Sequence, residues 1–253
     1  SQNGLFSHES RFIARAEISE IPRFNISHLQ FIGRKQRKSY ELSLFLGSDE
    51  IPIYISTFKA GNIQENSFGA TASLNYSINN NNQISTGTTF GLVTLHSTNS
   101  YKLLFPETSL NRIFYGGMRF WGAFKKNSLD RHYFARHGSK IEGRVTFGLK
   151  PFMQLVHKDN AGVLDSLSNP DNYMKISFSY ERNVPLAKRF VWMFGTDVRL
   201  TTDKAPEFDV FYVGASDHTT RNRDVAFYGF GYREVNVPSF LIEIGRASCR
   251  ERV

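Results

Sequence analysis

Residues 67–78 read Ser-Phe-Gly-Ala-Thr-Ala-Ser-Leu-Asn-Tyr-Ser-Ile, in which small or polar residues alternate with apolar ones. Successive side chains of a β-strand point to opposite faces, so this stretch has an apolar face from Phe68 to Ile78 and a polar face from Ser67 to Ser77. The polar run Asn79–Asn82 follows, and Asn tolerates the backbone angles of a tight turn. Alternation resumes at Ile84, so the stretch predicts an antiparallel hairpin.

The same alternation recurs on both sides of this hairpin. Met174, Ile176 and Phe178, for example, alternate with Lys175 and Ser177. We therefore predict an all-β chain of antiparallel strands. The expected strands are residues 10–19, 24–33, 39–47, 51–60, 66–78, 83–95, 112–125, 140–150, 152–158, 173–182, 189–201, 207–214, 225–234 and 238–244.

Three features favour a transmembrane β-barrel over a soluble sandwich, which also alternates. The segments approach the ~9–11 residues of a tilted membrane-spanning strand. Charged residues fall in strand centres on the polar face, where a water-filled lumen would receive them, and aromatics gather near strand ends. The connections also alternate in length, with short ones at 79–82 and 183–188 and long polar ones at 96–111, 159–172 and 216–224.

Composition narrows the class further. Aromatic residues make up 14% of the chain, which favours strands, and no apolar run approaches the ~20 residues of a spanning helix. The net charge of +8 is spread along the sequence, which is typical of a basic lumen or a contact with anionic lipid, so we expect no nucleic-acid partner. Cys249 is the sole cysteine, which excludes an intrachain disulfide and a cysteine-based metal site.

The chain divides into three parts. Residues 1–60 alternate less regularly and fit either the first barrel strands or a periplasmic linker. Residues 61–245 are expected to form the barrel strands. The alternation stops at Gly245, and residues 246–253 are expected to be a non-native tail, such as an assembly or cloning scar.

Two segments resemble a known family. Residues 129–141, with Asp130, Phe134, Gly138 and Ser139, resemble the loop-to-strand element of the bacterial surface-antigen barrel superfamily. Residues 208–214 and 227–233 are similar to the late barrel region of patatin-like phospholipases that end in such a barrel. In two places the chain departs from the family pattern. Ala215 follows Gly214, and Gly231-Tyr232-Arg233 replaces the Arg-Gly-aromatic order of the assembly-factor members.

The resemblance implies a bacterial outer-membrane protein and an incomplete part of a sixteen-stranded barrel. Our preferred hypothesis is the membrane anchor or translocation barrel of a patatin-like phospholipase, a lipid acyl hydrolase whose hydrolase domain is absent from this chain. A stand-alone assembly or transport barrel and a soluble β-sandwich binding module remain as alternatives. The expected partners are outer-membrane lipid and the barrel-assembly machinery that inserts such proteins.

The candidate site residues lie on the lumen face and in a loop. Asp197 and Arg199 share one face of a strand, where they would form a lumen ion pair or a permeation constriction. In the resembling family a loop corresponding to Gly229, Tyr232 and Arg233 folds back into the lumen, and its Arg pairs with an acid on the wall. An ordinary lumen-facing strand position is the alternative for Arg233.

No complete catalytic or metal site is apparent in the sequence. Patatin chemistry needs a Gly-x-Ser-x-Gly elbow, and the nearest match, Gly214-Ala215-Ser216-Asp217-His218, lacks the final Gly. His132 and His137 near Asp130 lack further ligands for a metal. We therefore expect no enzyme activity from this chain and no cofactor.

Overall fold

A computed structural model describes residues 2–3, 10–17, 22–33, 35–55, 58–97, 110–131, 135–159, 162–168, 171–187, 190–202, 211–213, 224–225, 235–237 and 240–249. Nearly all of these residues belong to β-strands, as the alternation predicts. The described residues include no helix that is long and apolar enough to cross a membrane.

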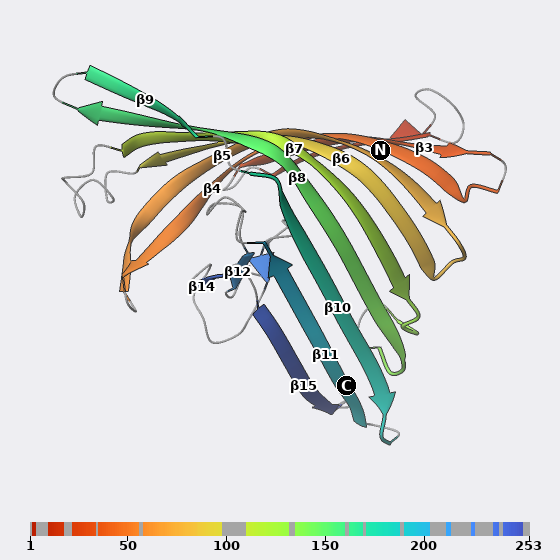
Figure 1. The fold of residues 1–253 in the computed structure, drawn as a ribbon. Helices are drawn as coiled ribbons and strands as arrows, with labels where there is room; N and C mark the ends of the chain where they lie inside the picture. Colours follow the sequence, from red (N-terminus) through yellow and green to blue (C-terminus); the bar gives the residue numbers. More distant parts are fainter. Residues whose placement is uncertain are drawn as a thin grey trace.

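The strands form one large sheet and one small sheet. The large sheet has the order β1-β2-β3-β4-β5-β6-β7-β8-β10-β11-β15, with β9 pairing to β8 beside this path, and the small sheet has the order β13-β12-β14. Figure 1 shows the large sheet curled into a trough. The strand bounds are β1 Gln2–Asn3, β2 Ser10–Glu17, β3 Arg23–Ile32, β4 Lys38–Ile55, β5 Phe58–Ser77, β6 Asn82–Ser97, β7 Leu110–Asn127, β8 Gly138–Asp159, β9 Gly162–Ser168, β10 Tyr173–Pro185, β11 Phe190–Thr201, β12 Phe211–Val213, β13 Asp224–Val225, β14 Val235–Val237 and β15 Phe240–Cys249.

The hairpin that the sequence predicts around Asn79 is confirmed. β5 and β6 pair antiparallel from Ser77 opposite Gln83 to Ile63 opposite Ser97. The Asn79 side-chain oxygen accepts hydrogen bonds from the backbone amides of Asn81 and Asn82, at 3.0 and 2.8 Å. The side chain therefore satisfies the turn amides that the ladder leaves unpaired.

The two faces of the sheet differ sharply in polarity. On the outer, convex face large apolar side chains stay exposed, with Leu74 at 58% and Leu46 at 56%. On the inner, concave face lie buried polar side chains such as Ser73 and Asn183. A soluble sandwich buries its apolar face under a second sheet, so the sandwich alternative is wrong for the described residues. Lipid is the solvent that such an outer face requires.

β4 corrects the prediction of separate strands at 39–47 and 51–60. It continues from Lys38 to Ile55, and residues 58–60 belong to β5. β3 pairs with β4 only as far as Gly47, so beyond that point β4 pairs with β5 alone among the described strands. Pro52 lacks a backbone donor, and a strand with one unpaired edge tolerates this.

β8 corrects a second pair of predicted strands, at 140–150 and 152–158. It runs unbroken from Gly138 to Asp159 through Pro151. The register with β7 shifts between Gly116 and Met118, opposite this proline, and β10 pairs with β8 only up to Gly148. Proline fits here because the ladder is already interrupted on both sides. β9 then pairs back onto the end of β8, within a region predicted to be a loop.

The last part of the large sheet also differs from prediction. β15 continues past Gly245 to Cys249, with Cys249 opposite Phe190 of β11, so the predicted strand end at 244 is wrong. The origin of residues 246–253 stays a prediction. β1 and β15 lie at the two ends of the sheet order and do not pair with each other. The described sheet is therefore open, in agreement with the expected incomplete barrel.

Candidate binding site on the inner wall

Three cationic side chains come from three neighbouring strands of the inner wall. Arg119 belongs to β7, Arg144 to β8 and Lys175 to β10. Trp121 of β7 lies opposite Thr146 of β8, and Thr146 lies opposite Lys175. The period of two on each strand turns these residues to the same face, where all five line one cavity.

Trp121 and Arg144 form the best-defined contact of this group. The guanidinium carbon of Arg144 lies 4.1 Å from the centre of the Trp121 ring, a cation–π arrangement. The indole nitrogen of Trp121 donates to the Thr89 hydroxyl at 3.3 Å, and that hydroxyl lies 3.1 Å from the hydroxyl of Thr71. These bonds hold the indole edge, so the ring offers Arg144 a fixed surface.

Glycines make room for these large side chains. A Cβ at Gly87 would lie 2.7 Å from the Trp121 ring, and one at Gly91 would lie 2.9 Å from the Arg119 guanidinium. Real Cβ atoms do not approach other atoms so closely. The glycines of β6 therefore allow Trp121 and Arg119 to lie flat across the neighbouring strand.

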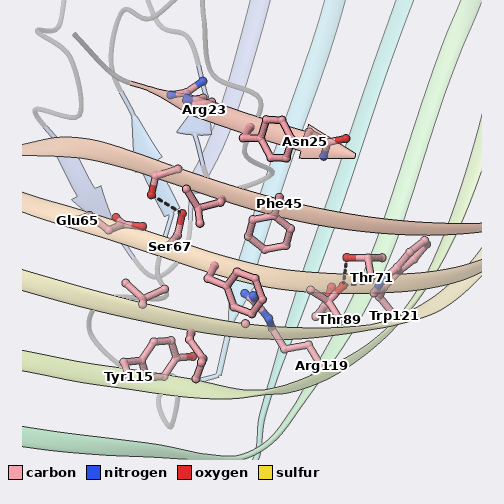
Figure 2. Close-up of a pocket in the computed structure, with 18 of the residues that line it drawn as sticks. Arg23, Asn25, Phe45, Glu65, Ser67, Thr71, Thr89, Tyr115, Arg119 and Trp121 are labelled. Carbon is pink, nitrogen blue, oxygen red and sulfur yellow. Dashed lines mark hydrogen bonds between the residues drawn. The ribbon is translucent and has the colours of Figure 1, made fainter. Parts of the chain in front are cut away.

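The cavity has a volume of about 450 Å³ and extends from β3 to β10. Figure 2 shows Arg119 and Trp121 on one part of its wall and Arg23 and Glu65 on another. Glu65 is 1% exposed and lies opposite Asp49, whose carboxylate is 3.7 Å from the Arg23 guanidinium. The wall thus carries carboxylates on β4 and β5 and cations on β7, β8 and β10.

Two buried tyrosines lie next to the cation group. The hydroxyls of Tyr115 and Tyr173 are 3.3 Å apart. Tyr173 is 2% exposed, and its ring lies over Gly148, where a Cβ would come within 2.1 Å of the ring. This packing fixes the inner wall beside Arg119, because Gly148 lies directly opposite Arg119 in the ladder.

Asp197 and Arg199 lie together on the inner face of β11, as the alternation predicts. The Arg199 Nε donates to an Asp197 carboxylate oxygen at 2.6 Å, and a second guanidinium nitrogen lies 3.1 Å from the other oxygen. Two-point contact of this kind is among the stronger ion pairs. Gly229, Tyr232 and Arg233, the other predicted lumen residues, lie outside the described residues.

The family-like loop forms a structural turn between β7 and β8. One Asp130 carboxylate oxygen accepts the backbone amides of Arg136 and His137, at 2.8 and 3.3 Å. Desolvation raises the pKa of Asp130, but these two hydrogen bonds and the nearby His137 and Arg131 side chains outweigh it, so the pKa lies below its ordinary value.

Gly138 and Ser139 close the same turn. Gly138 has φ +111°, which favours glycine, and a Cβ there would lie 2.2 Å from the Ser128 carbonyl oxygen. The Ser128 hydroxyl donates to the Ser139 carbonyl at 3.0 Å. Phe134 lies outside the described residues. In the described part of this turn, the side chains stabilise the backbone and do not present reactive groups.

The described residues contain no group of three or more His, Cys, Asp or Glu side chains that could hold a metal. His137 lies 3.5 Å from Asp130, whereas His132 is outside the described residues, as is Ser216. The geometry of the pair His132 and His137, and that of the segment around Ser216, therefore lies outside the described residues.

Lys175 lies on the face that the alternation predicts to be polar, but the alternation does not single out the group around Trp121. The available signal was an aromatic residue at a position where the alternation requires a polar one. Arg119, Trp121 and Ala123 share the inner face of β7, so Trp121 is out of pattern there. What it contacts depends on the register of β7 against β6 and β8, which alternation alone does not specify.

Comparison with known proteins identifies the family. The model of the Omp85 superfamily domain matches residues 22–239. A solved structure of BamA from Haemophilus ducreyi, lacking POTRA domains 1–3, has a TM-score of 0.60 and 16% identity to this chain. It aligns over 84% of this chain and 40% of its own, so the chain spans less than half the length of that protein.

The search of curated proteins found no match. The family match confirms the surface-antigen part of the resemblance and the location in the bacterial outer membrane. A barrel of this kind is not an enzyme, which supports the prediction that this chain carries no catalytic site of its own. The chain belongs to the Omp85 superfamily, as an outer-membrane β-barrel of a bacterium.

Proposed function

We propose that this barrel anchors a polypeptide in the outer membrane and forms the route by which that polypeptide crosses the membrane. The polypeptide is a patatin-like phospholipase domain encoded with the barrel. The observation that carries the anchoring and passage role is the contrast between the two faces of the sheet. Leu74 and its neighbours present an apolar surface to lipid, while the inner wall has a cavity of about 450 Å³ whose lining includes charged residues such as Arg119, Arg144 and Lys175. A lumen with this lining accepts hydrated backbone and charged side chains.

The phospholipase part of the proposal is supported by the resemblance of residues 208–214 and 227–233 to the late barrel region of such enzymes. The coding sequence upstream of Ser1 tests it directly. We expect a Gly-x-Ser-x-Gly elbow and an Asp-Gly partner there, since the serine needs a strained turn and a nearby base. An upstream region that encodes only periplasmic adaptor domains would refute this part.

Activity measurements separate the two parts of the protein. The full-length protein in outer-membrane vesicles should release fatty acid from phospholipid, and alanine at the elbow serine should abolish the release. The refolded barrel chain should release none. Turnover by that chain that is lost in Ser216→Ala would place chemistry in the barrel and contradict the proposal.

A stand-alone assembly or transport barrel is the second candidate. It is favoured by the likeness in fold to BamA, whose solved structure aligns over 84% of this chain. Depletion of the protein in its native cell distinguishes the candidates. An assembly role predicts lower levels of other outer-membrane barrels, whereas the anchoring role predicts loss of the attached domain alone.

We also propose two partners for the barrel in the cell. The exposed side chains of the outer face, such as Leu46 and Phe68, fit the acyl chains of outer-membrane lipid. Insertion of a chain with such a surface calls for the barrel-assembly machinery. Depletion of that machinery should leave the chain unfolded and sensitive to protease in the periplasm.

A further inference from the structure

Four connections at one end of the large sheet are rich in Lys and Arg. They join β3 to β4, β5 to β6, β7 to β8 and β10 to β11, and the antiparallel registers bring all four to the same end of the sheet (Figure 1). We call this end the turn rim and define it by residues 33–41, 76–84, 124–142 and 181–190.

The turn rim carries a large excess of positive charge. Its sequence holds twelve Lys and Arg against four Asp and Glu, counted over all of its residues, and the adjoining segments 4–9 and 250–253 add two of each sign. The connections that begin and end at the opposite end hold ten Lys and Arg against fifteen Asp and Glu, over residues 17–23, 48–66, 96–112, 150–172 and 201–240. The strand topology therefore gathers at one end the positive charge that is spread along the sequence.

Three cations of the turn rim lie on the outer face of the sheet. Lys38 of β4 is opposite Tyr76, and Arg182 of β10 is opposite Phe194. Both of these aromatic residues belong to the apolar outer face. Lys126 of β7 reaches the same face by the period of two along its strand. These cations therefore extend toward the lipid side of the rim.

The acids at the same strand ends face the other way. Glu41, Glu142 and Glu181 lie on the inner face by the same alternation. The Glu142 carboxylate lies 3.4 Å from the amino group of Lys140 and 3.9 Å from that of Lys125, which are inner residues too. The described strand ends thus present cations to the lipid side and acids to the lumen.

A belt of aromatic side chains lies on the membrane side of the outward cations. Phe124 is 38% exposed on the outer face, and Tyr180 packs edge-on against Phe194 with 5.9 Å between ring centres. Phe124 and Tyr180 precede Lys126 and Arg182 by two positions, which is about 7 Å along a strand. Rings in such a belt lie where the acyl chains meet the headgroups, so the cations beyond them lie at the level of the phosphates.

We propose that Lys38, Lys126 and Arg182 bind the phosphate groups of anionic phospholipid in the periplasmic leaflet of the outer membrane. Short turns of a transmembrane barrel face the periplasm and long polar connections face outward, so the turn rim lies at that leaflet. The aliphatic stem of each side chain lies along the aromatic belt while its charged end reaches the phosphate. This inference extends the lipid contact proposed above, and it does not depend on an attached phospholipase.

Trp192 reports which lipid lies beside Arg182. It is 46% exposed on the outer face of β11, two positions before Phe194, which lies opposite Arg182. Trp121→Phe leaves Trp192 as the sole indole. The full-length protein with this change is refolded into phosphatidylcholine bilayers that contain a fixed share of lipid brominated in its acyl chains, because bromine quenches an indole only at close range. We expect brominated phosphatidylglycerol to quench Trp192 more strongly than brominated phosphatidylcholine.

Arg182→Gln should lower this preference for phosphatidylglycerol about fivefold, the contribution expected of one Lys or Arg near an anionic surface. Lys140→Gln is the matched control. It removes one charge from the neighbouring strand of the same rim, but on the inner face, and should leave the preference unchanged. Equal quenching by the two brominated lipids in the parent protein, or an equal loss of preference in the two variants, overturns the proposal.

Lipid retention measured by native mass spectrometry supplies a second readout that needs no change of tryptophan. Lys125 and Lys126 are neighbours in the sequence and face opposite sides of β7. Lys126→Gln should retain less phosphatidylglycerol than the parent protein, whereas Lys125→Gln should match the parent. Heat-modifiable gel migration checks that both variants are folded. An equal loss in both would show that retention follows net charge and not the outward face, and would refute the site.

The leaflet is tested by labelling in cells. Asn80→Cys in a Cys249→Ser background places a sole thiol in the turn between β5 and β6. A maleimide that does not cross the outer membrane should label it only after that membrane is permeabilised, and labelling of intact cells would place the turn rim outside and contradict the proposal. The vesicles contain no other protein, so absence of a lipid preference in them would assign the rim to an acidic protein partner instead.

Discussion

Aromatic rings lying over glycines are the main packing device of the inner wall. Tyr173 covers Gly148, Trp121 covers Gly87, and Phe45 of β4 lies over Gly69 of β5. In each case the ring of one strand fills the space that the missing side chain of the next strand leaves. These contacts replace a conventional core, since the sheet buries few large apolar side chains among the described residues.

Gly148→Ala should therefore destabilise the barrel. The added Cβ would meet the Tyr173 ring at 2.1 Å, and forcing extra volume into a packed site costs ~1–3 kcal/mol. Gly143→Ala on the same strand is the control, because nothing lies within 4 Å of the added atom. Urea unfolding in lipid vesicles measures both, and equal stability of the two variants would show that the ring does not occupy this position.

Leu74 and Asn75 test the two faces of β5. Leu74 is 58% exposed on the outer face, so Leu74→Arg should cost ~2–4 kcal/mol if it lies near the bilayer midplane. Asn75→Arg places the same charge in the lumen and should be much milder. A folding titration of both variants in bilayers makes the comparison, and equal penalties would contradict the assignment of faces.

At the scale of elements, the turn between β5 and β6 and the turn between β7 and β8 each contain a side chain that accepts two backbone amides, but the two acceptors differ in chemistry. Asn79 accepts its turn amides with a neutral amide oxygen, whereas Asp130 accepts with a carboxylate. Of these two acceptors, only the Asp130 carboxylate titrates. The turn between β7 and β8 is therefore expected to respond to acid, while the turn between β5 and β6 is not.

The pKa of Asp130 is lowered in the folded chain, so the stabilisation by its carboxylate is complete above the ordinary pKa of 3.8 and is lost as pH falls through the folded value below it. Hydrogen exchange, corrected for intrinsic rates, should show the amides of Arg136 and His137 losing protection in that acid range. Asp130→Asn should remove this acid dependence, and the amides of Asn81 and Asn82 serve as internal controls. Identical acid profiles for the parent and Asp130→Asn would contradict the prediction.

The pairing of β11 with β15 can be tested through the sole cysteine. Cys249 lies directly opposite Phe190, and such antiparallel partners have Cα atoms ~4.5–5.5 Å apart, within reach of a disulfide. Phe190→Cys should therefore form a disulfide with Cys249 in the folded, oxidised protein, as detected by non-reducing mass spectrometry. Val191→Cys points to the opposite face and should form none. Absence of the first disulfide in folded protein would show that β15 ends before Cys249.

At the scale of the whole molecule, the apolar outer face determines the solvent. Because large apolar side chains remain exposed from β3 to β11, the chain should partition into detergent and refold into bilayers with heat-modifiable migration. Phase separation and gel migration measure this. Recovery as a monodisperse soluble monomer without detergent would refute a membrane environment.

Alternation by itself determined the fold class, the hairpin at Asn79 and the facing of Asp197 and Arg199, because strand periodicity is a local property of the chain. The turn before β8 was expected from the family resemblance of residues 129–141, whereas the positive φ of Gly138 is a finding of the structure. Alternation did not determine the lengths of β4 and β8. The predicted breaks fell at residues 48–50 and at Pro151. Only the pairing of neighbouring strands shows that β4 continues beyond the end of its pairing with β3 and that β8 passes Pro151 at a bulge.

The tertiary structure alone decided the contacts of the inner wall. Arg144 and Trp121 are 23 positions apart, and they meet because Trp121 is opposite Thr146, two residues beyond Arg144. A slip of one residue would turn one of these side chains to the lipid face. The sequence thus determined that the wall is polar and cationic, whereas the register between strands decided which cations converge on one cavity.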